Sequence, residues 1–346
     1  MNGPQADGSS SHKATSGSRA QAAGARGEAD IKHLLQRLRL TPVTIVLSMV
    51  TLTAILIGVV WVTHLPSYLR TTQVNWLFYV AAFIVAYGQY VGFATSLRGA
   101  STTRLPWGQT IELEVAESLT QMATPEGFGS LALSLRYLTA KGLATAEAAT
   151  AVGLSAFVTT TSGAIVIPIA GIAAAQSINV DQLKKDIPSS NWLLIVIILA
   201  IAAAVTVLVK APKARQKVKE WGIQAKAYGD TVIHHPTRGL VIAGGELFTI
   251  GCQAACLMLL LAALHLHGNV AAVLVITQLA GTASNIVPVP GGLGAPEALL
   301  VAGLTAMGLH QTDAIVAGLS YRMATYWLPP LPGTALLFDM IARKRI

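Results

Sequence analysis

Long runs without charged residues are the feature that most limits how this chain can fold. Asp, Glu, Lys and Arg are absent from Val43 to Val62, Asn75 to Leu97, Ala148 to Val180, Trp192 to Val209 and Asn269 to Pro296. Two further runs, Gly239 to His265 and Ala314 to Phe338, contain one charged residue each. Crossing about 30 Å of hydrocarbon takes roughly 20 apolar residues in a helix. With 53% hydrophobic and 12% charged residues, the sequence predicts an all-α polytopic membrane protein with about seven to nine transmembrane helices.

One of these runs is interrupted by NIVPVPGGLGAPEALL (Asn285 to Leu300), which holds three prolines, three glycines and a carboxylate. Proline breaks a helix, and each backbone group left unpaired against lipid costs several kcal/mol. The break is therefore expected to face protein or a wet cavity, where Gly291, Gly292 and Gly294 let the backbone approach a ligand closely. A helix beginning near Ala295 would point free N–H groups at that cavity and attract an anion. The alternative is that these glycines only allow tight helix packing.

The break has a counterpart in the first half of the chain. PEGFG (Pro125 to Gly129) is followed by Gly142, Leu143, Glu147 and Ala148, as PGGLG (Pro290 to Gly294) is followed by Gly308, Leu309, Asp313 and Ala314. Each copy reads as a helix, a Pro/Gly break, a short helix, a Gly-Leu turn and a long apolar run. The sequence therefore predicts two interrupted helical units, at about 109–176 and 269–342, although two Ala- and Gly-rich segments can also resemble each other by chance.

Positive charge predicts the topology. Lys and Arg gather in residues 1–40, in the linker 210–238 and in the end 343–346. Short loops rich in Lys and Arg stay in the cytoplasm, so both termini and the linker are predicted to be cytoplasmic, around a single transmembrane domain at 41–342. On this topology the two interrupted units start from opposite faces. An inverted repeat of broken helices is a transporter architecture.

The first 40 residues are rich in Gly, Ser and Ala, which predicts a disordered tail. The sequence IKHLLQRLRL at its end favours a short basic interfacial helix. The excess of positive charge lies beside membrane spans, where the positive-inside bias and anionic lipid explain it. We therefore expect no nucleic-acid partner.

Charged residues inside the membrane are the best candidates for a binding site, because each costs roughly 2.5 to 3.5 kcal/mol at a helix centre. Arg322 lies near the middle of its run, and its guanidinium can bind Glu297, Glu246 or a lipid phosphate. The alternative is that Arg322 forms a purely structural ion pair.

Charged residues also surround the first break. Glu126 and Arg136 are further candidates for substrate binding. Glu114 and Glu117 can share one helix face, but a wet interfacial helix explains them equally well. We find no Ser/His/Asp, Cys/His or metal-ligand pattern in the sequence, so we expect neither catalysis nor a metal or cofactor.

The second half of the chain carries a resemblance. PVPGGLGAPEALLVAGLTAMGL (Pro288 to Leu309), followed by GLSYRMATYWLPPLPG (Gly318 to Gly333) and a terminal Arg-Lys-Arg, resembles the membrane domain of the lysylphosphatidylglycerol synthase family. The resemblance implies a flippase-like protein of the bacterial plasma (inner) membrane that handles phospholipid or glycolipid. It also places Tyr321, of the Tyr-Arg pair, among the site residues.

In the aminoacyl-lipid synthases of this family, a soluble domain transfers the amino acid and the membrane half translocates the product. This sequence ends shortly after its last apolar stretch, so we expect that the word synthase does not describe an activity of this chain. The first half departs from the family pattern of Pro, then Gly-Glu, then Arg. Here Ser130 follows Gly129, and the nearest arginine is Arg136.

The favoured function is binding or translocation of an anionic phospholipid or glycolipid. A second copy of the chain and a separate lipid-modifying enzyme are the protein partners left open. A small-solute secondary transporter is the alternative, because the same inverted repeat supports it. A non-transporting scaffold needs no buried charge, so Glu246, Glu297 and Arg322 argue against that third function.

Overall fold

The computed structural model describes residues 73–123, 128–175, 212–286 and 294–346. These residues form helices and short connections, with no β-strand among them, which confirms the predicted all-α class. Several predictions concern residues outside these ranges: the tail 1–40, the spans Val43 to Val62 and Trp192 to Val209, and the candidates Glu126, Gly291 and Gly292.

The described helices are α4 (Trp76–Ala100), α5 (Trp107–Ala123), α6 (Phe128–Ala140), α7 (Thr145–Ala175), α10 (Pro212–His234), α11 (Pro236–Ala263), α12 (Val270–Ile286), α13 (Ala295–Ala306), α14 (Gln311–Arg322) and α15 (Pro330–Ala342). A π-helical turn, η3 (Met323–Trp327), joins α14 to α15. Within the described ranges, α4, α7 and α11 are long and apolar enough to cross a bilayer, and α12 and α13 are shorter apolar helices. Helices α4, α7, α11 and α12 match four of the predicted runs.

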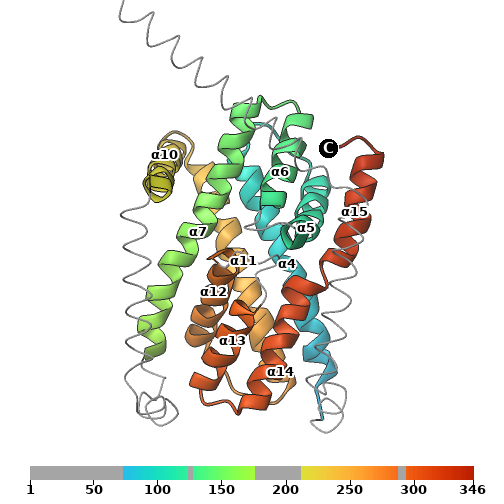
Figure 1. The fold of residues 1–346 in the computed structure, drawn as a ribbon, viewed down its shortest axis with the longest axis vertical. Coiled ribbons are helices and arrows are strands. Elements are labelled where there is room, and N and C mark those ends of the chain that lie inside the picture. The colour runs from blue at the N-terminus through green and yellow to red at the C-terminus, as the bar shows by residue number, and fades with distance from the viewer. Residues whose placement is uncertain (1–72, 124–127, 176–211, 287–293) are drawn as a thin grey trace, which may run out of the picture.

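Helices α4 and α11 form a closely packed antiparallel pair through the middle of the bundle (Figure 1). Small residues allow this approach: a Cβ added to Gly92 would lie 2.6 Å from the carbonyl oxygen of Gly245, and a Cβ added to Gly245 would lie 2.6 Å from that of Gly92. In membranes, small residues at a helix interface let backbones come together in this way. At one end of the pair, the N–H of Asn75 donates to the carbonyl of Ala263 at 2.9 Å.

Two short helical hairpins enter the bundle from opposite ends. Figure 1 shows α5 and α6 side by side in the upper half, and α12 and α13 side by side in the lower half. The two Pro/Gly breaks, Pro125 to Gly129 and Pro290 to Gly294, fall at the connections inside these hairpins, of which residues 124–127 and 287–293 lie outside the described residues. The run Asn269 to Pro296 is therefore not one continuous helix, as its prolines predict.

The turns that follow the two hairpins have the same backbone geometry. Gly142 and Gly308 both have φ of +91°, a conformation that favours glycine. Leu143 N–H donates to the Leu138 carbonyl at 3.2 Å, and Leu309 N–H donates to the Leu304 carbonyl at 3.3 Å. This is the six-to-one bond of a Schellman motif. The two Gly-Leu pairs matched in sequence thus end their helices with the same hydrogen-bonded turn, which supports the predicted repeat.

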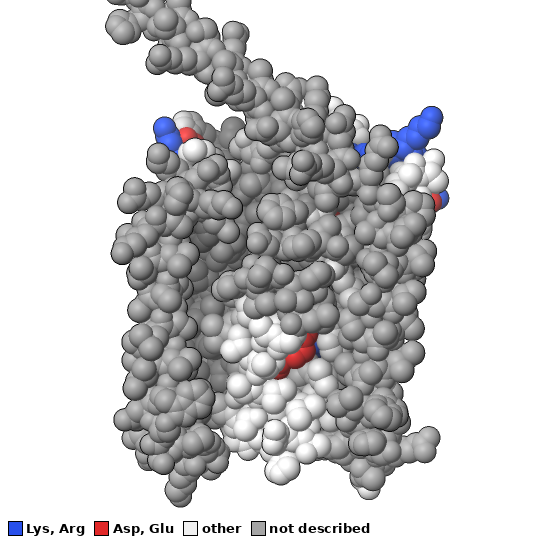
Figure 2. All heavy atoms as spheres, in the orientation of Figure 1, with Lys and Arg blue, Asp and Glu red and all other residues white. Residues whose placement is uncertain are grey.

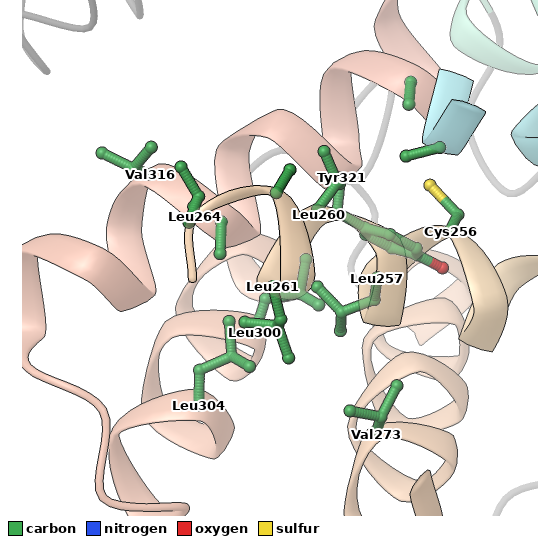
Figure 3. Packing of buried hydrophobic residues seen from close by; sticks show 14 of the residues in the cluster. Cys256, Leu257, Leu260, Leu261, Leu264, Val273, Leu300, Leu304, Val316 and Tyr321 are labelled. Atoms are coloured by element: carbon green, nitrogen blue, oxygen red, sulfur yellow. The ribbon is translucent and has the colours of Figure 1, made fainter. Parts of the chain in front are cut away.

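The larger hydrophobic core lies between α11 and the second hairpin. Figure 3 shows Leu257, Leu260 and Leu261 of α11 facing Leu300 and Leu304 of α13, with all five side chains fully buried. Large apolar side chains on the outside of the bundle are exposed, including Leu77 and Ile84 on α4, Leu240 and Phe248 on α11 and Ile172 on α7. Such an exterior suits a lipid environment, where apolar side chains need no burial in protein.

Helix α10 and the C-terminus lie at the same end of the bundle, the upper end in Figure 1. Arg238, just after α10, is held there by the end of α4: its guanidinium donates to the carbonyls of Gly99, Ala100 and Ser101 at 3.1, 3.1 and 2.6 Å. The predicted linker 210–238 is thus mostly helical. Its location at the same end of the bundle as the C-terminus agrees with one shared face, and the assignment of that face to the cytoplasm stays a prediction.

Candidate functional site

The local sequence after Arg322 forces an irregular turn inside the membrane domain. Pro329 and Pro330 have no N–H to continue an α-helical ladder. The N–H of Leu328 instead donates to the carbonyl of Met323 at 3.0 Å, which is the five-residue step of a π-helix. Such turns are frequent at functional sites. The run Ala314 to Phe338 is therefore divided by η3, which begins directly after Arg322.

Arg322 pairs with Glu297. Its Nε donates to Glu297 Oε1 at 2.6 Å, and the two side chains are 7% and 14% exposed. Glu297 lies in the first turn of α13, where its Oε2 accepts the N–H of Gly294 at 2.7 Å. Gly294 has φ of +98°, so the chain enters α13 through a conformation that suits glycine. One carboxylate thus contacts both the arginine and the helix N-terminus.

The guanidinium of Arg322 keeps unused donor capacity. Its Nη2 is buried and has no hydrogen-bond partner among the described residues. Its Cζ lies 4.1 Å from the ring centroid of Tyr326, so one face of the guanidinium is covered by an aromatic ring. A buried cationic N–H without a partner costs free energy. The guanidinium and the positive N-terminal end of α13 both favour an anion, and one with several acceptor oxygens could also accept from Nη2.

The pair lies in a mostly uncharged part of the molecule. Figure 2 shows acidic atoms, with basic atoms beside them, in the lower half of the visible face, among described residues that are otherwise uncharged. A charged group in such surroundings interacts more strongly with an ion than it would in water.

Glu246 was a candidate partner for Arg322, but the structure gives it other contacts. It is 1% exposed on α11, and its Oε1 accepts the hydroxyl of Thr159 on α7 at 2.7 Å. One turn earlier on α7, the hydroxyl of Ser155 lies 3.1 Å from that of Ser96 on α4. Glu246 therefore belongs to a polar contact between α4, α7 and α11.

Two carboxylates of α5 have partners other than Arg322. Glu112 pairs with Arg345 at 2.6 Å. Glu117 accepts a hydrogen bond from Ser134 of α6, inside the first hairpin. Glu114 lies close to both Glu117 and Glu246. Across the described ranges, no group of three or more His, Cys, Asp or Glu residues has an arrangement that could hold a metal ion.

Two other predicted site residues are not brought to the pair. Arg136 is exposed on α6, because this helix buries the face that carries Tyr137 and Leu138. Tyr321 is 5% exposed and packs in the apolar cluster of Figure 3, close to Leu257. Although Tyr321 directly precedes Arg322, the two side chains point in different directions, since successive helical residues point about 100° apart.

Two residues at the site were missed from the sequence. Tyr326 follows Arg322 by four residues, which is the spacing of neighbours on a helix surface. Gln89 on α4 reaches η3, where its Nε2 donates to the carbonyl of Thr325 at 3.1 Å. A signal for Gln89 existed: it is the single glutamine in the run Asn75 to Leu97. An isolated amide inside a membrane span needs a polar partner.

Comparison with known proteins agrees with this architecture. The family described as Lysylphosphatidylglycerol synthase TM region matches residues 40–333, which includes all the helices from α4 to α14, η3 and the Arg322–Glu297 pair. No curated protein matches the chain. Because the match covers most of the sequence, this chain belongs to the Lysylphosphatidylglycerol synthase TM region family of integral membrane proteins.

Proposed function

We propose that this protein binds a membrane lipid with a phosphate in its headgroup and carries that headgroup across the bilayer, with Arg322 as the phosphate contact. The observation that carries the proposal is the unpartnered, buried Nη2 of Arg322 beside the N-terminus of α13. Arginine presents its donors in a planar fork that fits phosphate oxygens. A helix N-terminus adds backbone N–H groups and a positive dipole end.

A lipid is a better ligand than a soluble solute because the exterior of the bundle is apolar. Leu77, Ile84 and Phe248 are among many apolar side chains exposed on the bundle, so acyl chains can stay in the bilayer. The headgroup phosphate then needs a polar contact inside the bundle, and Arg322 offers it. The membership of a family named after a lipid synthase also supports a lipid ligand.

The proposal of translocation rests on the two helical hairpins, α5–α6 and α12–α13, which enter the bundle from opposite ends. Broken helices that enter from opposite ends suit a protein whose central site opens to each face in turn. The location of α5–α6 in the upper half and of α12–α13 in the lower half of Figure 1 supports the predicted inverted repeat. We propose no catalytic role for this chain, so a lipid made elsewhere would be its cargo.

Binding and translocation can be tested on the purified full chain. Short-chain phosphatidic acid serves as the phosphate probe and short-chain diacylglycerol as the neutral control. We expect saturable binding of phosphatidic acid alone, loss of that binding in Arg322→Ala, and unchanged binding in Arg136→Ala, which removes an exposed arginine. Liposomes that hold the protein should also move a labelled phosphate headgroup between leaflets.

Other results would point elsewhere. Equal binding of diacylglycerol and phosphatidic acid, or full binding by Arg322→Ala, would contradict the proposed phosphate contact. Tight binding of glycerol phosphate, without binding of phosphatidic acid, would favour the small-solute transporter. Mass spectrometry of lipids that copurify with the protein would identify the natural headgroup.

A further inference from the structure

The carbonyl of Thr325 has lost both of its helical donors. In an α-helix it would accept the N–H of residue 329, and in a π-helix that of residue 330. Both positions are proline, so neither N–H exists. A carbonyl left unpaired at membrane depth costs several kcal/mol. A donor from elsewhere is needed to keep η3 in place.

Gln89 supplies that donor from another helix. It is 4% exposed on α4, and its Nε2 donates to Thr325 O at 3.1 Å. Its backbone carbonyl also accepts the hydroxyl of Thr249 on α11 at 3.3 Å, which ties this part of α4 to α11. The contact joins residues 236 positions apart. It is therefore a tertiary replacement for a missing local hydrogen bond.

Two more amides hold the side chain of Gln89. Gln253 Nε2 on α11 donates to Gln89 Oε1 at 3.2 Å, and Gln278 Nε2 on α12 donates to Gln253 Oε1 at 3.3 Å. All three amides donate in one direction, toward η3. With both its oxygen and its nitrogen engaged, the amide of Gln89 has a fixed orientation. This amide chain links the second hairpin to the turn that follows Arg322.

The orientation of η3 determines what Arg322 can contact. Arg322 lies directly before the turn, and Tyr326, which covers its guanidinium, lies within the turn. A π turn holds one more residue than an α turn, so a change from one to the other rotates everything after it by roughly 100°. Tyr326 would then leave the guanidinium, and the fork of Arg322 would lose its fixed direction.

We infer that Gln89 is a positioning residue for phosphate binding, which directs the fork of Arg322 by holding the Thr325 carbonyl and thereby the π turn. The inference rests on the proposed function, in which Arg322 binds phosphate. Gln89 itself does not contact Arg322 in the described hydrogen bonds. The effect of Gln89 on ligand affinity should therefore depend on whether the side chain at position 322 has a planar fork that must be oriented, as arginine has and lysine has not.

The test is a double-mutant cycle for binding of short-chain phosphatidic acid to the full chain in detergent. The proteins are wild type, Gln89→Leu, Arg322→Lys and the double variant, titrated to millimolar lipid so that weak binding is measured. We expect Gln89→Leu to weaken binding about tenfold in the Arg322 background, a change of about 1.4 kcal/mol. In the Arg322→Lys background it should weaken binding less than about twofold, because an ammonium has no planar fork to direct.

The outcomes separate a positioning role from a structural one. An equal loss in both backgrounds, or no loss in the Arg322 background, would overturn the inference while leaving the proposed function intact. Unchanged binding by Arg322→Lys and Arg322→Ala would instead overturn the proposed function. If Gln89→Leu does not fold, Gln253→Met replaces it in the test. This variant leaves the Gln89 side chain in place as a donor to Thr325 but removes the hydrogen bond from Gln253 that holds the Gln89 amide. That variant should weaken binding a few-fold in the Arg322 background and leave the Arg322→Lys protein unchanged.

Discussion

Glu297 lies where an anionic ligand of Arg322 would bind: one of its carboxylate oxygens accepts from Arg322 Nε at 2.6 Å, and the other accepts the N–H of Gly294 at 2.7 Å. The carboxylate thus uses two of the groups that a phosphate would use. A ligand must therefore compete with Glu297 or share Arg322 with it. This relationship makes the affinity for phosphate sensitive to the charge at position 297.

Removing that charge should increase affinity. In Glu297→Gln the side chain keeps its size, but a neutral amide competes less strongly than a carboxylate for the guanidinium. We expect the Kd for phosphatidic acid to fall by about tenfold, which corresponds to about 1.4 kcal/mol. Isothermal titration in detergent can measure it. Asp313→Asn, which neutralises a carboxylate in the first turn of α14, is the control, and weaker binding by Glu297→Gln would show that Glu297 assists the ligand.

The α4–α11 contact should tolerate no added methyl group at its closest point. Gly92→Ala would place a Cβ 2.6 Å from the carbonyl oxygen of Gly245, so the helices must separate. Overpacking of this kind typically costs about 1 to 3 kcal/mol, which we expect as a lower melting temperature in detergent. Gly251→Ala on α11 is the matched control, because no atom lies within 4 Å of its added Cβ. Equal melting temperatures for both variants would argue against close packing at Gly92.

Arg238 should stabilise the end of α4 through its guanidinium. It donates to three carbonyls, at Gly99, Ala100 and Ser101, that the helix end leaves without helical donors. Arg238→Ala is expected to lower the free energy of unfolding by about 2 kcal/mol. Arg238→Lys should recover part of this loss, since lysine keeps the charge but not the fork. Arg104→Ala, at an exposed arginine nearby, should leave the melting temperature unchanged.

The predicted topology can be tested with residues at the two ends of the bundle. His267 is exposed in the turn between α11 and α12, and Lys226 is exposed on α10. If the basic end is cytoplasmic, a membrane-impermeant thiol reagent should label His267→Cys in intact cells and Lys226→Cys only after lysis. The wild type, whose Cys252 and Cys256 are buried, is the blank. Labelling of position 226 in intact cells would reverse the topology.

The sequence predicts the helices better than it predicts their contacts. Charge-free runs reveal α4, α7 and α11 because the thickness of a bilayer fixes the length of a span. Pro and Gly reveal the break between α12 and α13, since their backbone chemistry is local. The matching turns at Gly142 and Gly308 are predictable for the same reason.

Contacts between distant segments are harder to predict. Glu246 is the single carboxylate of the run Gly239 to His265, and Glu297 directly follows the second break. Nothing in the local sequence decides which of them contacts Arg322. The structure pairs Arg322 with Glu297 because α13 and α14 form a hairpin that brings them together. The π turn was also not predicted, although the consecutive prolines at 329 and 330 remove the N–H groups that an α-helix would need.

The central claim is that Arg322 serves a ligand more than it serves the fold. Removing it leaves Glu297 partly exposed and still bonded to the N–H of Gly294, so the carboxylate keeps a partner. A purely structural pair would behave differently: loss of one member of a buried pair costs roughly 3 to 5 kcal/mol, and replacement of both by apolar residues recovers much of it.

The most direct measurement is thermal stability together with phosphatidic acid binding on four proteins: wild type, Arg322→Ala, Glu297→Leu and the double variant. We predict that Arg322→Ala no longer binds the lipid. Its melting temperature should stay within a few degrees of wild type, since larger domains lose roughly 2 to 4 °C for each kcal/mol of lost stability. A large loss of stability in Arg322→Ala that the double variant recovers, with lipid binding intact in the double variant, would contradict the account and make Arg322 a structural residue.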